Sequence, residues 1–187
     1  MSRVPPLKTY DPETFGHVGL VIGGESAERE VSLNGGAAVG AALRRKGVDY
    51  RVFDGPTQLF DAIRHDEIDR VFNLLHGPDG EDGSLQGALQ LMKVPVTGSD
   101  LASSALTMDK VRSKWVWERN GLKTPPFEVL PPADNDFTRA LDALGLPLFV
   151  KPTSLGSSIG ISKVKTEQGL QPAIELARQY GDTVIIE

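Results

Sequence analysis

The segment Lys151-Pro-Thr-Ser-Leu-Gly-Ser-Ser-Ile-Gly-Ile161 joins two apolar runs, residues 146–150 and residues 159–164. Two runs of strand length on either side of a loop rich in Gly and Ser predict a strand, a glycine loop and a second strand. Gly156 and Gly160 can adopt backbone angles that other residues avoid, so successive N–H groups can point into one concavity. The segment therefore predicts a hairpin whose loop suits a polyphosphate.

Side chains in and beside this loop favour the same interpretation. Lys151 supplies a positive charge at the end of the first strand, and three serines add hydrogen-bond donors: Ser154, Ser157 and Ser158. The loop is not a Walker A motif, because its lysine precedes the glycines and no Gly-Lys-Ser/Thr follows them. An ordinary hairpin turn, in which Gly and Ser serve only the backbone, is the alternative for the loop taken alone.

The composition excludes several classes of protein. The 187 residues are 40% hydrophobic and 24% charged, as in a globular protein of one large or two small domains. With a net charge of -5 and no basic block, nucleic acid is not expected as a partner. Cys is absent, which excludes disulfides and thiolate metal sites. No run is long enough to cross a membrane and no signal-like segment is present, so we expect a cytoplasmic protein without membrane contacts.

Residues 16–98 alternate strands with helices, which predicts a Rossmann-like α/β domain with a parallel sheet. Strands are expected over 18–22, 50–53 and 71–75, and helices over 28–46, 59–64 and 84–92. Parallel strands end along one edge of the sheet, so Gly23 and His76 should lie at the edge where ligands usually bind. The glycines at 23–24 lack the G-x-G-x-x-G spacing, and a nicotinamide cofactor is therefore not expected.

Residues 99–187 mix helices with hairpin strands and predict an α+β domain. Helices are expected over 101–120, with a break near 107–109, and over 137–144 and 166–179; strands are expected over 127–130, 148–151, 161–164 and 183–187. Residues 1–15 contain three prolines and no periodicity, which predicts a flexible leader. Nothing follows the apolar run at 184–186 to cover it, so we expect the chain to stop at a boundary between lobes.

Four residues stand where a ligand could be bound, but each also has an ordinary structural explanation. His76 follows a predicted strand, although a lone His is often structural. Glu28 begins a predicted helix, where a carboxylate can simply stabilise the helix dipole. Lys110 lies in a helical pattern, where an exposed lysine is common, and Lys151 adjoins the glycine loop. A Ser/His/Asp hydrolase is poorly supported, because the sequence has no G-x-S-x-G.

Four longer segments carry a more specific signal. They are Gly23-Gly-Glu-Ser-Ala-Glu-Arg-Glu-Val-Ser-Leu33, Leu75-His-Gly-Pro-Asp-Gly-Glu-Asp-Gly-Ser-Leu-Gln86, Met108-Asp-Lys110 and Lys151 to Ile161. In this order they closely resemble the D-alanine–D-alanine ligase family of ATP-grasp enzymes, over residues 17–187. The resemblance implies an N-terminal substrate domain over 16–98 and a central ATP-grasp lobe over 99–187. The family's third lobe has no counterpart in the chain.

The resemblance implies a bacterial enzyme that joins two D-alanines for peptidoglycan synthesis with ATP and magnesium. In the family, one D-alanine carboxylate attacks the γ-phosphate, and the amine of the second attacks the resulting acyl phosphate. Such chemistry needs neutralised phosphate charge, positioned substrates and exclusion of water. The alternatives are a D-alanine–D-lactate or D-serine ligase, another ATP-grasp ligase, and a nucleotide-binding fragment without turnover. A homodimer is also implied.

The resemblance assigns three residues to the first substrate. Glu28 would hold the amino group of the first D-alanine, and Ser157 would belong to the hydrogen-bonded set around that glutamate. His76 would lie near the carboxylate of the same D-alanine and favour its negative charge. These are the expected catalytic residues.

ATP is the ligand implied for the second set of residues. Lys110 and Lys151 would contact its phosphates, and the backbone of Ser157 and Ser158 would cradle them. Glu187 matches the family's glutamate at the adenine end of the cleft.

Two departures from the family affect these expectations. Leu155 stands where the family often has an acidic residue, which leaves the nucleotide contacts of the loop less defined. The family's magnesium ligands, transition-state arginine and second D-alanine site belong to its third lobe, so no metal ligand is assigned here. We therefore expect the chain by itself not to catalyse the full reaction.

Overall fold

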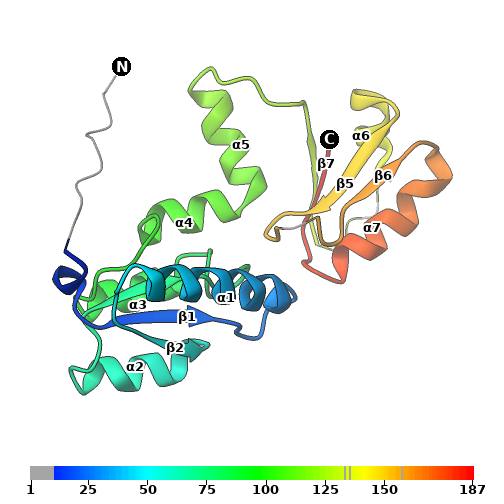
Figure 1. Cartoon of the computed structure of the whole chain (residues 1–187). Helices are drawn as coiled ribbons and strands as arrows, with labels where there is room; N and C mark the ends of the chain where they lie inside the picture. Colours follow the sequence, from blue (N-terminus) through cyan, green and yellow to red (C-terminus); the bar gives the residue numbers. More distant parts are fainter. Residues whose placement is uncertain (1–10, 133, 135, 157) are drawn as a thin grey trace. The chain divides into compact units, whose positions relative to one another are not determined.

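The computed structural model describes residues 11–132, 134, 136–156 and 158–187 (Figure 1). The chain divides into two compact units, one made of Met1–His76 and Leu85–Ser99 and the other of Gly77–Ser84 and Asp100–Glu187. The second unit thus includes a loop that lies within the range 16–98. Among the described residues, no helix is both long and apolar enough to cross a membrane.

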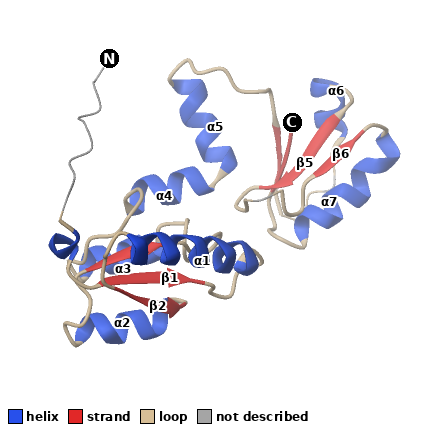
Figure 2. Cartoon of the chain, viewed as in Figure 1, coloured by secondary structure: helices blue, strands red, loops and turns tan. Residues whose placement is uncertain are grey.

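The first unit is built on a three-stranded parallel sheet, as the sequence predicts (Figure 2). Its strands are β1 (Val18–Ile22), β2 (Tyr50–Asp54) and β3 (Arg70–Asn73), in the order β2-β1-β3; its helices are α1 (Arg29–Arg45), α2 (Pro56–Arg64) and α3 (Ser84–Leu91). The central strand β1 pairs in parallel with both neighbours. All three strands therefore end at the same edge.

Alternation along β1 sends successive side chains to opposite faces of this sheet. On one face Ile22 packs against α1 at Gly36, where an added Cβ would lie 2.5 Å from a methyl of Ile22. On the other face Val21 and Leu59 of α2 belong to a fully buried core. Glycine lets α1 approach the sheet closely, so the start of α1 is brought to the end of β1.

Strand β3 ends two residues before the predicted end at position 75. The side-chain oxygen of Asn73 accepts the backbone N–H of Leu75 at 2.9 Å, which takes this group out of the sheet ladder. Leu74 still donates its N–H to the carbonyl of Val21, at 3.0 Å. His76 is therefore carried by a short segment beyond the strand rather than by the strand end itself.

The second unit contains a four-stranded antiparallel sheet in the order β4-β7-β5-β6. Its strands are β4 (Glu128–Leu130), β5 (Leu148–Pro152), β6 (Ser162–Val164) and β7 (Val184–Ile186), and its helices are α4 (Leu101–Met108), α5 (Lys110–Arg119), α6 (Thr138–Leu144) and α7 (Leu170–Arg178). The predicted hairpin is confirmed, because β5 and β6 pair directly, with Leu148 opposite Val164. Helix α7 buries Leu170 and Ile174 in the core of this unit.

Two local features explain where the helices of this unit begin. The predicted helix over 166–179 starts as a 3-10 turn, Glu167–Gly169, and becomes α7 at Leu170. This start places Pro172 in the first turn, where a missing N–H costs no intrahelical hydrogen bond. The predicted break near 107–109 is confirmed at Asp109, whose carboxylate caps α5 by accepting the N–H groups of Val111 and Arg112, at 2.9 and 3.0 Å.

The expected leader over 1–15 is ordered in the part that the structure describes. Asp11 caps a 3-10 turn, η1 (Pro12–Phe15), by accepting the N–H of Glu13 at 3.1 Å. Arg70 of β3 donates from Nε to the carbonyl of Phe15 at 2.6 Å, and its guanidinium lies 5.4 Å from the centre of the Phe15 ring. Residues 11–15 of the expected leader thus form a turn that contacts Arg70, and residues 1–10 lie outside the described part.

Candidate functional site

The β5–β6 hairpin presents the glycine loop and Lys151 together. Gly160 has a φ of +67°, and an added Cβ there would lie 2.8 Å from the ring of Tyr180, so this position needs glycine. Ser158 also has a positive φ, of 64°, which is uncommon for a residue with a side chain and marks local strain. Ser157, the residue predicted to contribute side chain and backbone, lies outside the described residues. Of the two serines predicted to cradle phosphate, Ser158 is the one whose backbone the structure describes.

Lys110 lies against the same loop. As the first residue of α5, it donates its backbone N–H to the carbonyl of Thr153 at 2.9 Å. Its ammonium donates to the carbonyl of Leu155 and lies 3.5 Å from that of Thr153. Helix α5 and the loop are thereby joined, and the structure brings Lys110 to the loop that the sequence selected for phosphate binding.

Lys151 and Glu187 meet across neighbouring strands. Lys151 follows Val150 in β5, and its ammonium donates to Oε1 of Glu187. The backbone of Glu187 exchanges hydrogen bonds with Phe149, at 2.6 and 2.9 Å, which extends the pairing of β5 with β7 to the last residue. The two residues that the resemblance placed at opposite ends of a nucleotide are thus directly paired in this structure.

Lys114 is a third lysine of this cluster, and the sequence did not single it out. Its side chain is 6% exposed, and Nζ lies 2.5 Å from Oε2 of Glu187. It also donates to Oγ1 of Thr124 at 2.9 Å and to the carbonyl of Pro125 at 3.0 Å. The available signal was its spacing of four residues from Lys110, which puts both ammonium groups on one face of α5.

The three lysines and Glu187 surround a cavity of about 310 Å³ within the second unit. The lining residues are Thr107, Lys110, Ser113, Lys114, Trp117, Thr124, Pro125, Lys151 and Glu187. Burial acts to raise the pKa of Glu187, but hydrogen bonds from Lys114 and Lys151 outweigh it and lower this pKa below its ordinary value. Glu187 is thus held as a carboxylate, and three positive charges face one negative charge. Such a cavity attracts anions.

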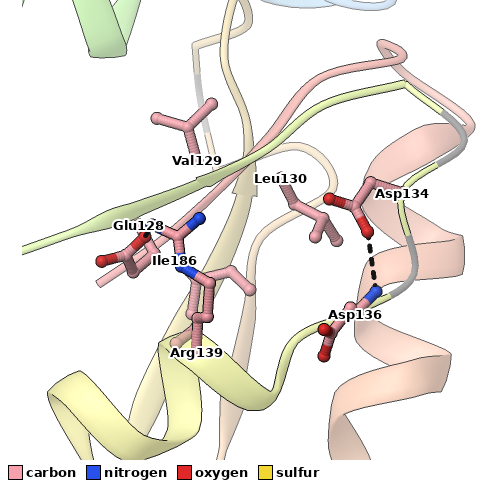
Figure 3. A pocket seen from close by; sticks show the side chains of 8 residues that line it. Glu128, Val129, Leu130, Asp134, Asp136, Arg139 and Ile186 are labelled. Carbon is pink, nitrogen blue, oxygen red and sulfur yellow. Dashed lines mark hydrogen bonds and ion pairs between the residues drawn. The ribbon is translucent and has the colours of Figure 1, made fainter.

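A second hollow of the same unit has a different character (Figure 3). It measures about 230 Å³ and lies beside the edge strand β4. Arg139 pairs with Glu128 at 3.2 Å, and Asp134 accepts the N–H of Asp136 at 2.9 Å. Asp136 in turn caps α6 by accepting the N–H of Thr138 at 3.0 Å. These charged groups serve one another and the helix, so this hollow is not a candidate site for phosphate.

Glu28 is a buried carboxylate of the first unit. It precedes α1 directly, where a carboxylate can stabilise the helix dipole, but its side chain makes no capping hydrogen bond. The residue is 2% exposed, and within the described part of the chain its Oε2 has no hydrogen-bond partner. A buried carboxylate without a partner is costly. An ammonium group of a ligand would satisfy it.

Ser32 ties the segment around Glu28 to the segment that carries His76. Its hydroxyl accepts the N–H of Gly23 at 2.8 Å and donates to the carbonyl of Leu74 at 2.6 Å. His76 is half-buried, and its Nδ1 lies 2.9 Å from the same carbonyl, which requires Nδ1 to be the donor. Both predicted residues of the first unit therefore follow strand ends at one sheet edge, and Ser32 is the link that sequence patterns did not reveal.

The acidic loop after His76 uses its carboxylates for structure. Glu81 accepts the N–H of Gly77 at 2.9 Å, and Asp82 accepts the N–H of Ser84, the first residue of α3, at 2.9 Å. Among the described residues, no group of three or more His, Asp or Glu side chains is arranged to hold a metal ion.

Two models of one protein family match this chain. The family model described as D-ala D-ala ligase N-terminus matches residues 54–99, and the model described as D-ala D-ala ligase C-terminus matches residues 116–187. D-alanine–D-alanine ligase B of Chromobacterium violaceum is 49% identical over 173 residues, which cover 92% of this chain and 57% of that protein.

Solved structures give the same result. The D-alanine–D-alanine ligase of Bacillus anthracis aligns with a TM-score of 0.81 and 33% identity, over 91% of this chain and 56% of that chain. A structure of the B. anthracis ligase complexed with ATP aligns with a TM-score of 0.79 and 31% identity, over 91% of this chain and 57% of that chain. The chain spans somewhat more than half the length of these relatives. Because both family models and both kinds of relative agree, the chain belongs to the D-alanine–D-alanine ligase family.

Proposed function

We propose that the protein acts in the cytoplasm as an ATP-dependent ligase that joins two D-alanines to D-alanyl-D-alanine for peptidoglycan synthesis. The observation that carries this proposal is the cluster of Lys110, Lys114, Lys151 and Glu187 beside the glycine loop, which provides an anion site where the family binds ATP. A homodimer is part of the same proposal.

The lysines would neutralise the phosphates of ATP. Lys110 donates to loop carbonyls and Lys151 donates to Glu187, so both ammonium groups have acceptors that a phosphate could replace. Phosphate oxygens are stronger acceptors than carbonyls, because they carry charge. Backbone N–H groups near Ser158 would add to the cradle. Glu187 would lie at the adenine end.

Glu28 would bind the ammonium group of the first D-alanine. Its Oε2 is buried and has no hydrogen-bond partner among the residues that the structure describes, and an ion pair in such a place is stronger than one in water. Nδ1 of His76 donates to the Leu74 carbonyl, so a ring that carries both protons could donate from Nε2 to the substrate carboxylate and favour its charged form. Ser157 is proposed to complete this set.

The reaction needs two displacements. A carboxylate oxygen of the first D-alanine bonds to the γ-phosphorus of ATP while the bond to ADP breaks, and the amine of the second D-alanine then bonds to the carbonyl carbon while phosphate leaves. The residues described here would bind and orient the nucleotide and the first substrate. Magnesium is part of the same proposal, and the family's ligands for it lie in its third lobe.

Phosphate release by the full-length protein tests the proposal. We expect phosphate to be released from ATP when D-alanine is supplied and not in its absence, with D-alanyl-D-alanine as the product identified by mass spectrometry. Glu28→Gln should raise the KM for D-alanine and leave the affinity for an ATP analogue unchanged. Faster turnover when D-lactate or D-serine is the second substrate would replace the dipeptide assignment. Nucleotide binding without any turnover would identify a non-catalytic protein.

A further inference from the structure

The two lysines that contact Glu187 are held in different ways. Lys114 is enclosed by three oxygen acceptors: Oε2 of Glu187, Oγ1 of Thr124 and the carbonyl of Pro125. Its Nζ also lies 5.0 Å from the centre of the Phe127 ring. An ammonium group has three N–H donors, so every donor of Lys114 is used. Lys114 is thus fixed in place by its surroundings.

Lys151 is held more loosely. Among the described residues, its ammonium has one hydrogen-bond acceptor, Glu187, besides a position 5.5 Å from the Phe149 ring. Its side chain is 20% exposed, compared with 6% for Lys114. Glu187 is therefore the described partner that Lys151 would exchange for an anion in the cavity.

Glu187 needs a counter-ion at all times. Its side chain is 14% exposed, and its two oxygens contact different lysines, Oε1 contacting Lys151 and Oε2 contacting Lys114. If Lys151 turned toward a phosphate, Oε2 would still be paired with Lys114 and Oε1 would become free to accept a hydrogen bond. Without Lys114, the same movement would leave a largely buried carboxylate unpaired, which is strongly unfavourable.

We propose that Lys114 is a positioning residue of the nucleotide site: it anchors Glu187, so that Lys151 can leave this carboxylate for a phosphate of the nucleotide. Lys114 itself does not touch the phosphates, because its donors are used within the protein. This inference rests on the proposed function, since it assumes that the cavity receives a nucleotide.

The test measures the affinity of the full-length protein for the β,γ-methylene analogue of ATP by calorimetry. Lys114→Met should weaken binding roughly 10- to 100-fold, because Lys151 must then either stay with Glu187 or leave it unpaired. Lys123→Met, which alters an exposed lysine just after α5, is the matched control and should change affinity by less than about twofold. Lys151→Met should also weaken binding.

A variant cycle separates positioning from plain packing. In a Glu187→Gln background no buried charge needs an anchor, so adding Lys114→Met should change affinity by less than about threefold. An equal loss in both backgrounds would show that Lys114 does not act through Glu187 and would overturn the inference. Lys114→Arg keeps the charge and should retain affinity within about fivefold; it serves if Lys114→Met does not fold, and a loss as large as that of Lys151→Met would contradict the inference.

Failure of the inference and failure of the proposed function give different results. If Lys151→Met weakens binding and Lys114→Met behaves like the Lys123→Met control, the nucleotide site stands and the positioning role is wrong. If the unaltered protein does not bind the analogue, the proposed function fails and the inference fails with it.

Discussion

Arg29 and Asp54 form a two-point ion pair at the edge of the parallel sheet, with Nη1–Oδ1 and Nη2–Oδ2 distances of 2.6 and 2.5 Å. Arg29 also donates to the carbonyl of Gly24 at 2.8 Å, and Asp54 accepts the N–H of Gly24 at 3.1 Å. The pair thus holds both sides of the turn that leads to Glu28. A hydrogen bond from Arg29 and one from the Gly24 backbone lower the pKa of Asp54 to about 2.

Asp54→Asn should therefore loosen the substrate side of the protein more than its fold. The ion pair is exposed, so we expect only a small loss of stability. The KM for D-alanine should nevertheless rise several-fold, because the turn that leads to Glu28 is no longer held in position. Steady-state kinetics with D-alanine as the varied substrate measures this. Asp61→Asn removes a comparable exposed ion pair, with Arg64 in α2, and serves as the control. Equal KM values for the two variants would contradict the prediction.

The carboxylate of Glu187 should make stability depend on pH. Burial acts to raise its pKa, but hydrogen bonds from Lys114 and Lys151 lower it by more than burial raises it. The pKa in the folded protein therefore lies below the ordinary value of 4.5. A group with a depressed folded pKa stabilises the protein above its unfolded pKa, and this contribution is lost as the pH falls through the folded pKa. The free energy of unfolding should therefore decrease below about pH 4.5.

Denaturant unfolding at several pH values checks this prediction with Glu187→Gln as the comparison. The difference in stability between the two proteins should be constant from pH 7 to pH 5 and should shrink at lower pH. A difference that stays unchanged down to pH 3 would mean that the lysines do not stabilise the carboxylate form of Glu187.

Two adjacent glycines of α1 should respond in opposite ways to a methyl group. Gly36→Ala would place Cβ 2.5 Å from a methyl of Ile22, and we expect this overpacking to cost about 1–3 kcal/mol. Gly35→Ala meets no atom within 4 Å and should stabilise the helix by up to about 1 kcal/mol. Thermal unfolding of both variants measures the difference. Similar midpoints would indicate that α1 does not pack closely on β1.

Gly160 should be required by the glycine loop for two reasons. Its φ of +67° is unfavourable for alanine, and the added Cβ would lie 2.8 Å from the Tyr180 ring. Gly145→Ala, at a φ of +68° with no atom within 4 Å, has the conformational strain without the crowding. We expect both variants to lose about 1 kcal/mol from the strained backbone, and only Gly160→Ala to lose affinity for the ATP analogue as well. Unchanged affinity in Gly160→Ala would argue against a role of this loop in nucleotide binding.

Much of the fold was predictable because it depends on patterns that are local in the chain. The alternation of apolar strands with amphipathic helices indicated the parallel sheet, and the glycine loop between two apolar runs indicated the hairpin. The break before Lys110 was visible as well, and Asp109 explains it by capping α5. Where the structure departs from a predicted boundary or segment, one side chain accounts for the difference. Asn73 accepts the N–H of Leu75 and ends β3 early, and Arg70 donates to the carbonyl of Phe15.

The candidate site was predictable only in part. Glycine, serine and lysine close together in the sequence identified the loop and Lys151, and resemblance identified Glu28, His76, Lys110 and Glu187. Lys114 and Ser32 were not found, because a lysine or serine inside a helix has the same pattern whether it faces solvent or a buried partner. Their roles are defined by residues distant in the chain, Glu187 for Lys114 and Leu74 for Ser32.

The amino-acid sequence thus indicated most of the elements, the parallel sheet, the hairpin and the resemblance to the family, since backbone preference, apolar periodicity and contiguous motifs are properties of neighbouring residues. Tertiary structure alone decided which charges meet: it buried Glu28, whose Oε2 has no hydrogen-bond partner in the described part of the chain, and it set Glu187 between Lys114 and Lys151. The physical reason is that burial and ion pairing depend on distances in space, and folding brings these side chains together from separate strands and helices.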